Sequence, residues 1–249
     1  MLIAQELTYY GLDLYKKREL PRLLNALCEV EGIEWIRLHY AYPSKFPLEV
    51  FNVMASQPKI CNYLDIPIQH ANDDVLARMK RQITQKETRE LIEYARLIIP
   101  DIALRTTLLV GFPGETNREF EDLCRFVTEM RFDRLGVFQY SHEEDTTAHQ
   151  LKDNVPAKTK AKRANEIMEI QKEISLEKNQ AKIGKSFKVL FDRKEGDYFI
   201  GRTESDSPEV DNEVLVSAEE NYVRIGDFAE ILIEDANEFD LFGSIVVNS

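Results

Sequence analysis

A loop with the sequence GFPGE, residues 111–115, follows the apolar stretch TLLV and is the first candidate for chemistry in this chain. Glycine lets a backbone approach a ligand closely, and proline holds a backbone in one conformation. The loop could therefore hold a small molecule against its backbone. A tight turn from a strand into a helix, with no ligand, accounts for the same residues equally well.

Polar or aromatic residues also stand where four other apolar runs end. These ends are Gln5, HYAYP (39–43), PIQH (67–70) and QYSHEE (139–144). In parallel α/β sheets, open or closed, ligands bind beyond the carboxyl ends of the strands. Together with the GFPGE loop, these make five strand ends that carry such residues, and this favours a ligand site over a set of plain turns.

The elements that must position these residues alternate along the first 150 residues. Apolar runs predict strands at 2–5, 35–40, 63–68, 103–110 and 134–140. Helical patterns lie between them at 19–31, 48–57, 73–81 with 88–99, and 118–130. This order predicts an α/β fold with a parallel sheet. Because a parallel strand is usually interior and the first one starts at residue 2, we expect the chain to begin in the middle of a domain.

The rest of the chain changes its period. Residues 156–183 predict one long helix with a thin apolar stripe and charges on its remaining surface. Period-two patterns then predict strands at 186–193, 197–204, 212–218, 228–235 and 239–247. Five antiparallel strands in so short a segment favour a small closed β-barrel, because closure removes exposed edges.

The charge is unevenly distributed. The formal net charge of the 249 residues is −12, and from Gly184 onward 16 acidic residues face 6 basic ones, a balance of −10. The first 183 residues hold the other 28 acids and 26 bases, a balance of −2. A segment so acidic repels phosphate and attracts basic partners.

Other sequence signals are weak or negative. Cys28, Cys61 and Cys124 lie too far apart for ligand pairing, so no metal ligand is nominated. No apolar run approaches the roughly 18 residues needed to cross a bilayer. The start, MLIAQELTYYG, has no basic segment and no small-residue cleavage site, which favours a cytoplasmic protein.

Several motifs in order resemble the radical S-adenosylmethionine (SAM) methylthiotransferases, most closely the branch that modifies an aspartate of ribosomal protein S-twelve. They are IAQELTYYGLDLY, RLHYAYPSKFP, YLDIPIQHANDDVLARMKR, TTLLVGFPGET and FDRLGVFQYSHEEDT. The terminal barrel resembles the OB-like TRAM domain of that family. The resemblance implies a partial TIM-like (β/α) barrel over 1–155, a connecting helix over 156–183 and a TRAM domain over 184–249.

The family uses SAM and two 4Fe–4S clusters, held in part by a CxxxCxxC motif that does not occur in this sequence. The resemblance therefore implies a C-terminal piece of an enzyme, without the first barrel strand, the cluster loop or the N-terminal domain. In the intact enzyme such a piece would supply SAM binding and substrate docking, but it would not catalyse alone. Because the cofactor carries the difficult chemistry, we nominate no catalytic residue.

The resemblance also implies a set of cofactor-binding residues. Guanidinium groups suit the SAM carboxylate, and aromatic and glycine residues suit its adenine and ribose. Aromatic residues Tyr9, Tyr10, His39 and Tyr42 would line the mouth. The predicted cofactor-binding residues are Gln5, Gln69, His70, Arg81, Arg105, Gly111, Phe112, Pro113, Gly114, Glu115, Gln139 and Tyr140.

The substrate implied by the resemblance is a basic ribosomal protein, S-twelve. Related enzymes modify an adenosine of transfer RNA, but an RNA-binding TRAM domain should be basic, and this one is acidic. Two further hypotheses are a binding module without turnover and an unrelated sugar-phosphate barrel. We expect a monomer with no membrane association.

The uneven charge generates a first prediction. If the acidic C-terminal segment steers a basic protein, binding to isolated ribosomal protein S-twelve should weaken steeply as salt is raised, because salt screens exposed charges. Titrations at a series of ionic strengths measure this. An affinity that does not change with salt would refute the steering.

Overall fold

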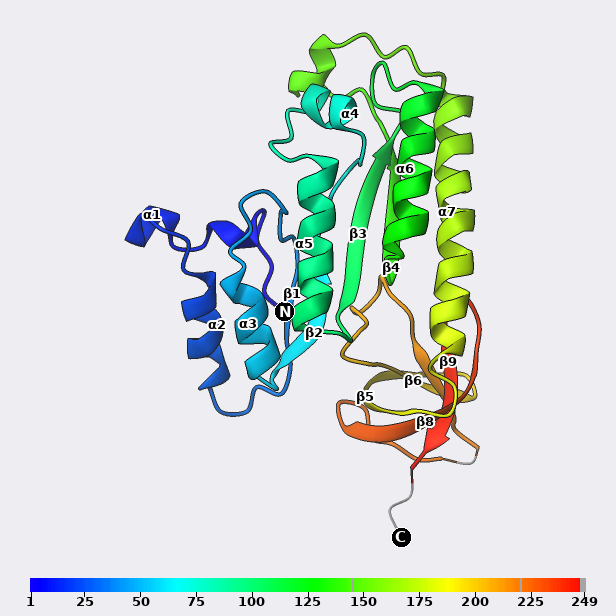
Figure 1. Ribbon diagram of the computed structural model, residues 1–249. Coiled ribbons are helices and arrows are strands. Elements are labelled where there is room, and N and C mark those ends of the chain that lie inside the picture. Colours follow the sequence, from blue (N-terminus) through cyan, green and yellow to red (C-terminus); the bar gives the residue numbers. More distant parts are fainter. Residues whose placement is uncertain (145, 220, 247–249) are drawn as a thin grey trace. The chain divides into compact units, whose positions relative to one another are not determined.

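The computed structural model describes residues 1–144, 146–219 and 221–246 (Figure 1). The chain divides into two compact units, Met1–Gln171 and Lys172–Ser249. The long helix α7, Ala157–Gln180, begins in the first unit and ends in the second. Each unit is described by itself.

The first unit is built on a parallel sheet of four strands in the order β1-β2-β3-β4 (Figure 1). The strands are β1 (Ile36–Leu38), β2 (Ile60–Asp65), β3 (Ala103–Val110) and β4 (Arg134–Gln139). This confirms the parallel α/β class. The prediction of a strand over 2–5 was wrong: Leu2 makes one isolated bridge to Leu38, and Gln5 lies in a bend.

The helices of this unit follow the predicted alternation. Four of them are α2 (Leu20–Cys28), α3 (Glu49–Ser56), α4 (Asp73–Arg78) and α5 (Gln85–Ile98), and α6 (Asn117–Met130) precedes β4. The short pieces η1 (Leu7–Tyr9), α1 (Leu12–Tyr15) and η2 (Thr147–Gln150) were not predicted.

Capping residues decide where the two longest helices before α7 begin. Thr84 and Glu87 form a capping box at α5, and Thr116 and Glu119 form another at α6. Each box satisfies backbone amides that the first turn of a helix leaves without partners. The GFPGE loop therefore leads directly into Thr116, the residue that starts α6.

The two faces of the sheet differ in character, since successive residues of a strand point to opposite sides. Leu104, Leu108 and Val110 of β3 are fully buried on the apolar face, which the helices cover (Figure 1). Arg105 of β3 lies on the other face, beside Asp65 of β2. A sheet with one polar face can accept a polar ligand there.

The second unit contains the end of α7 and a closed five-stranded barrel in the order β5-β6-β7-β9-β8. The strands are β5 (Ser186–Glu195), β6 (Tyr198–Arg202), β7 (Val214–Ser217), β8 (Phe228–Ala236) and β9 (Leu241–Ile245). The predicted barrel is confirmed. Residue 247, the predicted end of the last strand, lies outside the described residues.

The prediction that all barrel strands are antiparallel was wrong for one pair. β9 enters between β7 and β8, antiparallel to β8 but parallel to β7. The interior is filled by apolar side chains such as Val189, Phe191 and Ile231. The local pattern of each strand sets which side chains point inward, but the partner of the last strand is set by closure.

Close strand packing in the barrel generates a second prediction. A Cβ added at Gly201 of β6 would lie 2.6 Å from the Leu190 carbonyl oxygen of β5, whereas one at Gly136 would meet only Arg105 Nη2 at 3.8 Å. Gly201→Ala should therefore lower the free energy of unfolding by about 2 kcal/mol or more, because the added methyl forces strands apart. Gly136→Ala is the matched control. Equal denaturant midpoints for the two variants would contradict this account.

Candidate functional site

The GFPGE loop is held by its own acidic residue. Glu115 Oε2 accepts a hydrogen bond from the Phe112 amide at 3.0 Å and another from the Gly111 amide. Glu115 is only 5% exposed, and burial raises the pKa of its carboxyl group, while Arg163 and the two amides act against that rise. The Glu115 carboxylate thus turns back and closes the loop.

The aromatic residues of the site pack on each other. Phe112 and Tyr140 meet edge to face with ring centroids 5.4 Å apart, and Val75 of α4 completes this apolar cluster. The Tyr140 hydroxyl donates to the Ala148 carbonyl at 3.3 Å. Both rings are buried, so in this structure they tie the ends of β3 and β4 together.

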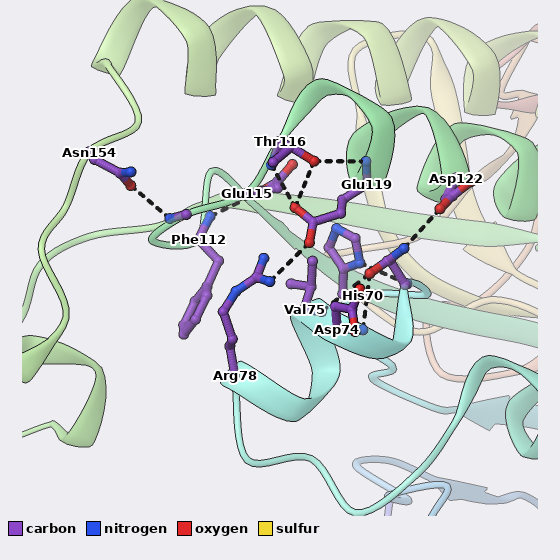
Figure 2. Close-up of polar contacts among 12 residues, drawn as sticks. His70, Asp74, Val75, Arg78, Phe112, Glu115, Thr116, Glu119, Asp122 and Asn154 are labelled. Carbon is purple, nitrogen blue, oxygen red and sulfur yellow. Dashed lines mark hydrogen bonds and ion pairs between the residues drawn. The ribbon is translucent and has the colours of Figure 1, made fainter.

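A charged cluster lies behind the loop, between α4 and α6. Arg78 Nη1 donates to Glu119 Oε1 at 2.9 Å, and the Glu119 carboxylate also caps α6. Burial opposes ionisation of Glu119, but the bonds from Arg78 and Thr116 lower its pKa to about 2. Figure 2 shows Arg78, Glu119 and His70 beside one another under the loop. The capping carboxylate thus links two helices.

His70 is buried rather than open to the mouth. It is 1% exposed, its Nδ1 accepts the Asn72 amide at 3.0 Å, and burial lowers its pKa to about 3. Because Nδ1 accepts this bond, the neutral ring carries its proton on Nε2, which has no hydrogen-bond partner among the described residues. This position does not match the prediction that His70 faces the ligand.

The other predicted residues are scattered around this end of the sheet. Gln69 has a positive φ of 69° and pairs with Leu108 through an isolated bridge. The Arg81 guanidinium lies 5.1 Å from the centre of the Tyr42 ring. Gln5, Gln139, Tyr9 and Tyr10 are exposed, and His39 is buried.

Arg105 lies apart from the loop, on the polar face of the sheet. Its Nη1 donates to Asp65 Oδ1 at 3.3 Å, and Asp65 is buried. The other carboxylate oxygen of Asp65 accepts the Tyr40 amide at 3.3 Å and lies 3.9 Å from His39 Nδ1. Asp65 therefore joins β2, β3 and the segment after β1, a role that the sequence pattern did not reveal.

An exposed aromatic residue on the same face was also missed. Phe138 of β4 pairs in register with Leu109 of β3, and it is 64% exposed. Gly136, two residues earlier on the same face, has no side chain, and Arg105 Nη2 lies over it, 3.8 Å from where a Cβ would be. An exposed aromatic ring on the same face of a sheet as an arginine is suited to a planar, polar ligand. Its position inside a strand pattern gave no signal that its ring would be exposed.

The described residues offer no group of three histidine, cysteine or acidic side chains that could hold a metal ion. Cys28 and Cys61 are buried and Cys124 is partly buried. In the described part of the chain, no helix combines the length and apolar character needed to cross a bilayer.

The buried histidine generates a third prediction. The unfolded chain protonates His70 below pH 6.5, but the folded chain keeps it neutral down to about pH 3. The native state therefore loses about 1.4 kcal/mol of stability per pH unit as pH falls through that window. His70→Asn, which keeps an acceptor for the Asn72 amide, should flatten the slope of unfolding free energy between pH 6.5 and 5. His149→Asn is the control, and identical slopes in both variants would show that His70 is not the cause.

Comparison with protein families gives two matches. Residues 4–127 match the Radical SAM superfamily, and residues 183–246 match the TRAM domain. The two matches fall in the parallel-sheet unit and in the barrel respectively.

Curated relatives match nearly the whole chain. A protein of Cytophaga hutchinsonii named ribosomal protein uS12 methylthiotransferase RimO is 60% identical over 246 residues, which is 99% of this chain and 56% of that protein. A protein of Christiangramia forsetii with the same name is 58% identical over 243 residues, which is 98% of this chain and 54% of that protein. The chain thus spans little more than half the length of these relatives.

A solved structure supports the fold. Coproporphyrinogen III oxidase (HemN) of Escherichia coli, a radical SAM enzyme, aligns with a TM-score of 0.51 at 21% identity, over 64% of this chain and 37% of that one. This likeness concerns the fold alone. The family matches and the curated relatives lead to one conclusion: residues 4–127 belong to the Radical SAM superfamily, and residues 183–246 form a TRAM domain.

Proposed function

We propose that this chain is the SAM-binding and substrate-docking part of a methylthiotransferase that modifies an aspartate of ribosomal protein uS12 in the cytoplasm. The observation that carries the proposal is the 60% identity to a uS12 methylthiotransferase over 246 residues, which is 99% of this chain and so includes residues of both units. In this proposal residues 1–155 bind the cofactor, 184–249 dock the substrate and 156–183 connect them.

The residues of the first unit fit SAM. Arg105 is the candidate for its carboxylate, because a guanidinium group can donate two parallel hydrogen bonds to a carboxylate. The exposed Phe138 ring suits a planar base on the same face of the sheet, where Gly136 adds no side chain beside the Arg105 guanidinium. The GFPGE loop and Gln139 close the end of the strands. When SAM is bound and reductively cleaved, it supplies the chemistry that abstracts a hydrogen atom from an unreactive carbon.

The iron–sulfur clusters do not fit the described residues. The three cysteines are dispersed, and none belongs to a metal-binding group in the described part of the chain. We therefore propose that cysteines outside these 249 residues hold both clusters, as the greater length of the relatives suggests.

The charge of the second unit supports a basic protein as the substrate. Arg193 pairs with Glu195 and Glu213, and Arg202 pairs with Asp192, so these basic groups are neutralised within the barrel itself. The acidic excess is left to act at long range. Transfer RNA, the alternative substrate, would meet a repulsive field.

The proposed function predicts a defined product. When the intact enzyme is incubated with SAM, a reductant and purified uS12, mass spectrometry should detect one methylthio group on an aspartate of uS12. Transfer RNA in the same assay should stay unmodified. Modification of an adenosine instead would replace this proposal with a transfer RNA methylthiotransferase.

Cofactor binding is tested separately, as a fourth prediction. Arg105→Ala should weaken SAM binding at least tenfold in calorimetric titration, equal to about 1.4 kcal/mol. Arg118→Ala, at an exposed position of α6, is the matched control. Because removing Arg105 leaves the buried Asp65 without this partner, the double variant with Asp65→Asn is measured as well. Unchanged affinity in folded Arg105 variants would remove this residue from the site.

A further inference from the structure

Residues 153–163 form hydrogen bonds and ion pairs with residues at the end of the sheet where the GFPGE loop lies, although they lie outside both family matches. Those matches end at residue 127 and resume at residue 183. From this segment Asp153, Asn154, Lys160 and Arg163 reach the ends of β3 and β4 or one another. We call these four residues the α7 clamp.

Arg163 holds the carboxylate that closes the loop. It is 5% exposed, and its Nη1 lies 3.3 Å from Glu115 Oε1 and donates to the Glu115 carbonyl at 3.2 Å. Its Nη2 donates to Asn117 Oδ1 at 3.0 Å. Because the same Glu115 carboxylate binds the Gly111 and Phe112 amides, Arg163 is linked to the loop backbone through one side chain.

Lys160 covers the first glycine of the loop. It is 6% exposed, and a Cβ added at Gly111 would clash with its aliphatic stem. Gly111 also has a positive φ of 75°, which favours glycine. Lys160 Nζ donates to the Tyr140 carbonyl at 3.0 Å and to Asp153 Oδ2 at 2.6 Å. One buried cation therefore touches the ends of both strands.

Asn154 completes the clamp on the second glycine, since its Oδ1 accepts the Gly114 amide at 2.7 Å (Figure 2). The amides of Gly111, Phe112 and Gly114 are thus all bonded to side chains. Apolar residues could pack α7 against the sheet without the desolvation penalty of two buried cations. Unlike an apolar contact, the buried cations make directional bonds: Lys160 donates to the Tyr140 carbonyl, and Arg163 donates to the Glu115 carbonyl and pairs with the Glu115 carboxylate.

We propose that the α7 clamp sets the GFPGE loop in its SAM-binding conformation, with Arg163 and Lys160 as positioning residues that do not touch the cofactor. This inference rests on the proposed function. It extends the cofactor site to residues that neither family match contains.

The test, a fifth prediction, compares Arg163→Met with Arg163→Lys and with Lys162→Met, an exposed position on the same helix. Without ligand, amide hydrogen exchange at Gly111 and Phe112 should be at least tenfold faster in Arg163→Met than in the wild type. It should be unchanged in Lys162→Met and partly restored in Arg163→Lys. Lys160→Met is measured in parallel and should also speed amide hydrogen exchange at Gly111 and Phe112. It takes the place of Arg163→Met in the test if that variant does not fold.

SAM affinity separates positioning from general stability. Calorimetric titration of the folded Arg163→Met protein should show affinity at least tenfold weaker, with partial rescue in Arg163→Lys. If Arg163→Met lowers the unfolding temperature but leaves SAM affinity and the exchange of both amides unchanged, the proposed role of the α7 clamp is wrong. If the wild-type protein does not bind SAM, the proposed function fails. Faster amide exchange in Arg163→Met would still show that the α7 clamp holds the loop in place.

Discussion

The ion pair between Glu115 and Arg163 is the interaction on which the carboxyl end of the parallel sheet in the first unit depends. Both side chains are almost fully excluded from solvent, and the carboxylate also accepts two consecutive loop amides. Burying one such charge without its partner is strongly destabilising, whereas the pair is tolerated because the two charges face each other and Glu115 Oε2 accepts two amides. The loop, the start of α6 and the start of α7 therefore share one electrostatic centre.

A second carboxylate organises the polar face of the sheet in a similar way. Asp65 joins Arg105, the Tyr40 amide and the region of His39. The two centres use the same physical device, an acidic group removed from water and satisfied by several donors. They differ in what they hold, since one closes a loop and the other orients a guanidinium group on an open face.

Much of this architecture could be predicted from the sequence, because local patterns determine it. The run from Ala103 to Val110 predicts β3, and the helical pattern over 118–130 predicts α6 to within one residue of its start. The partners of buried charges could not be predicted. Lys160 and Arg163 were assigned to a solvated helix surface, since a charged residue on a thinly apolar helix is usually exposed. His70 was placed facing the ligand because the pattern locates a strand end but does not give the direction of the side chain.

The insertion of β9 between β7 and β8 has a consequence for how the barrel forms. Its residues 241–245 pair with two strands that are not neighbours in the barrel without it. Before β9 is in place, β7 and β8 each present an unpaired edge, and such edges recruit other chains. Because pairing between distant segments is also slow to form, closure of the barrel depends on the docking of this one short strand, which covers both edges at once.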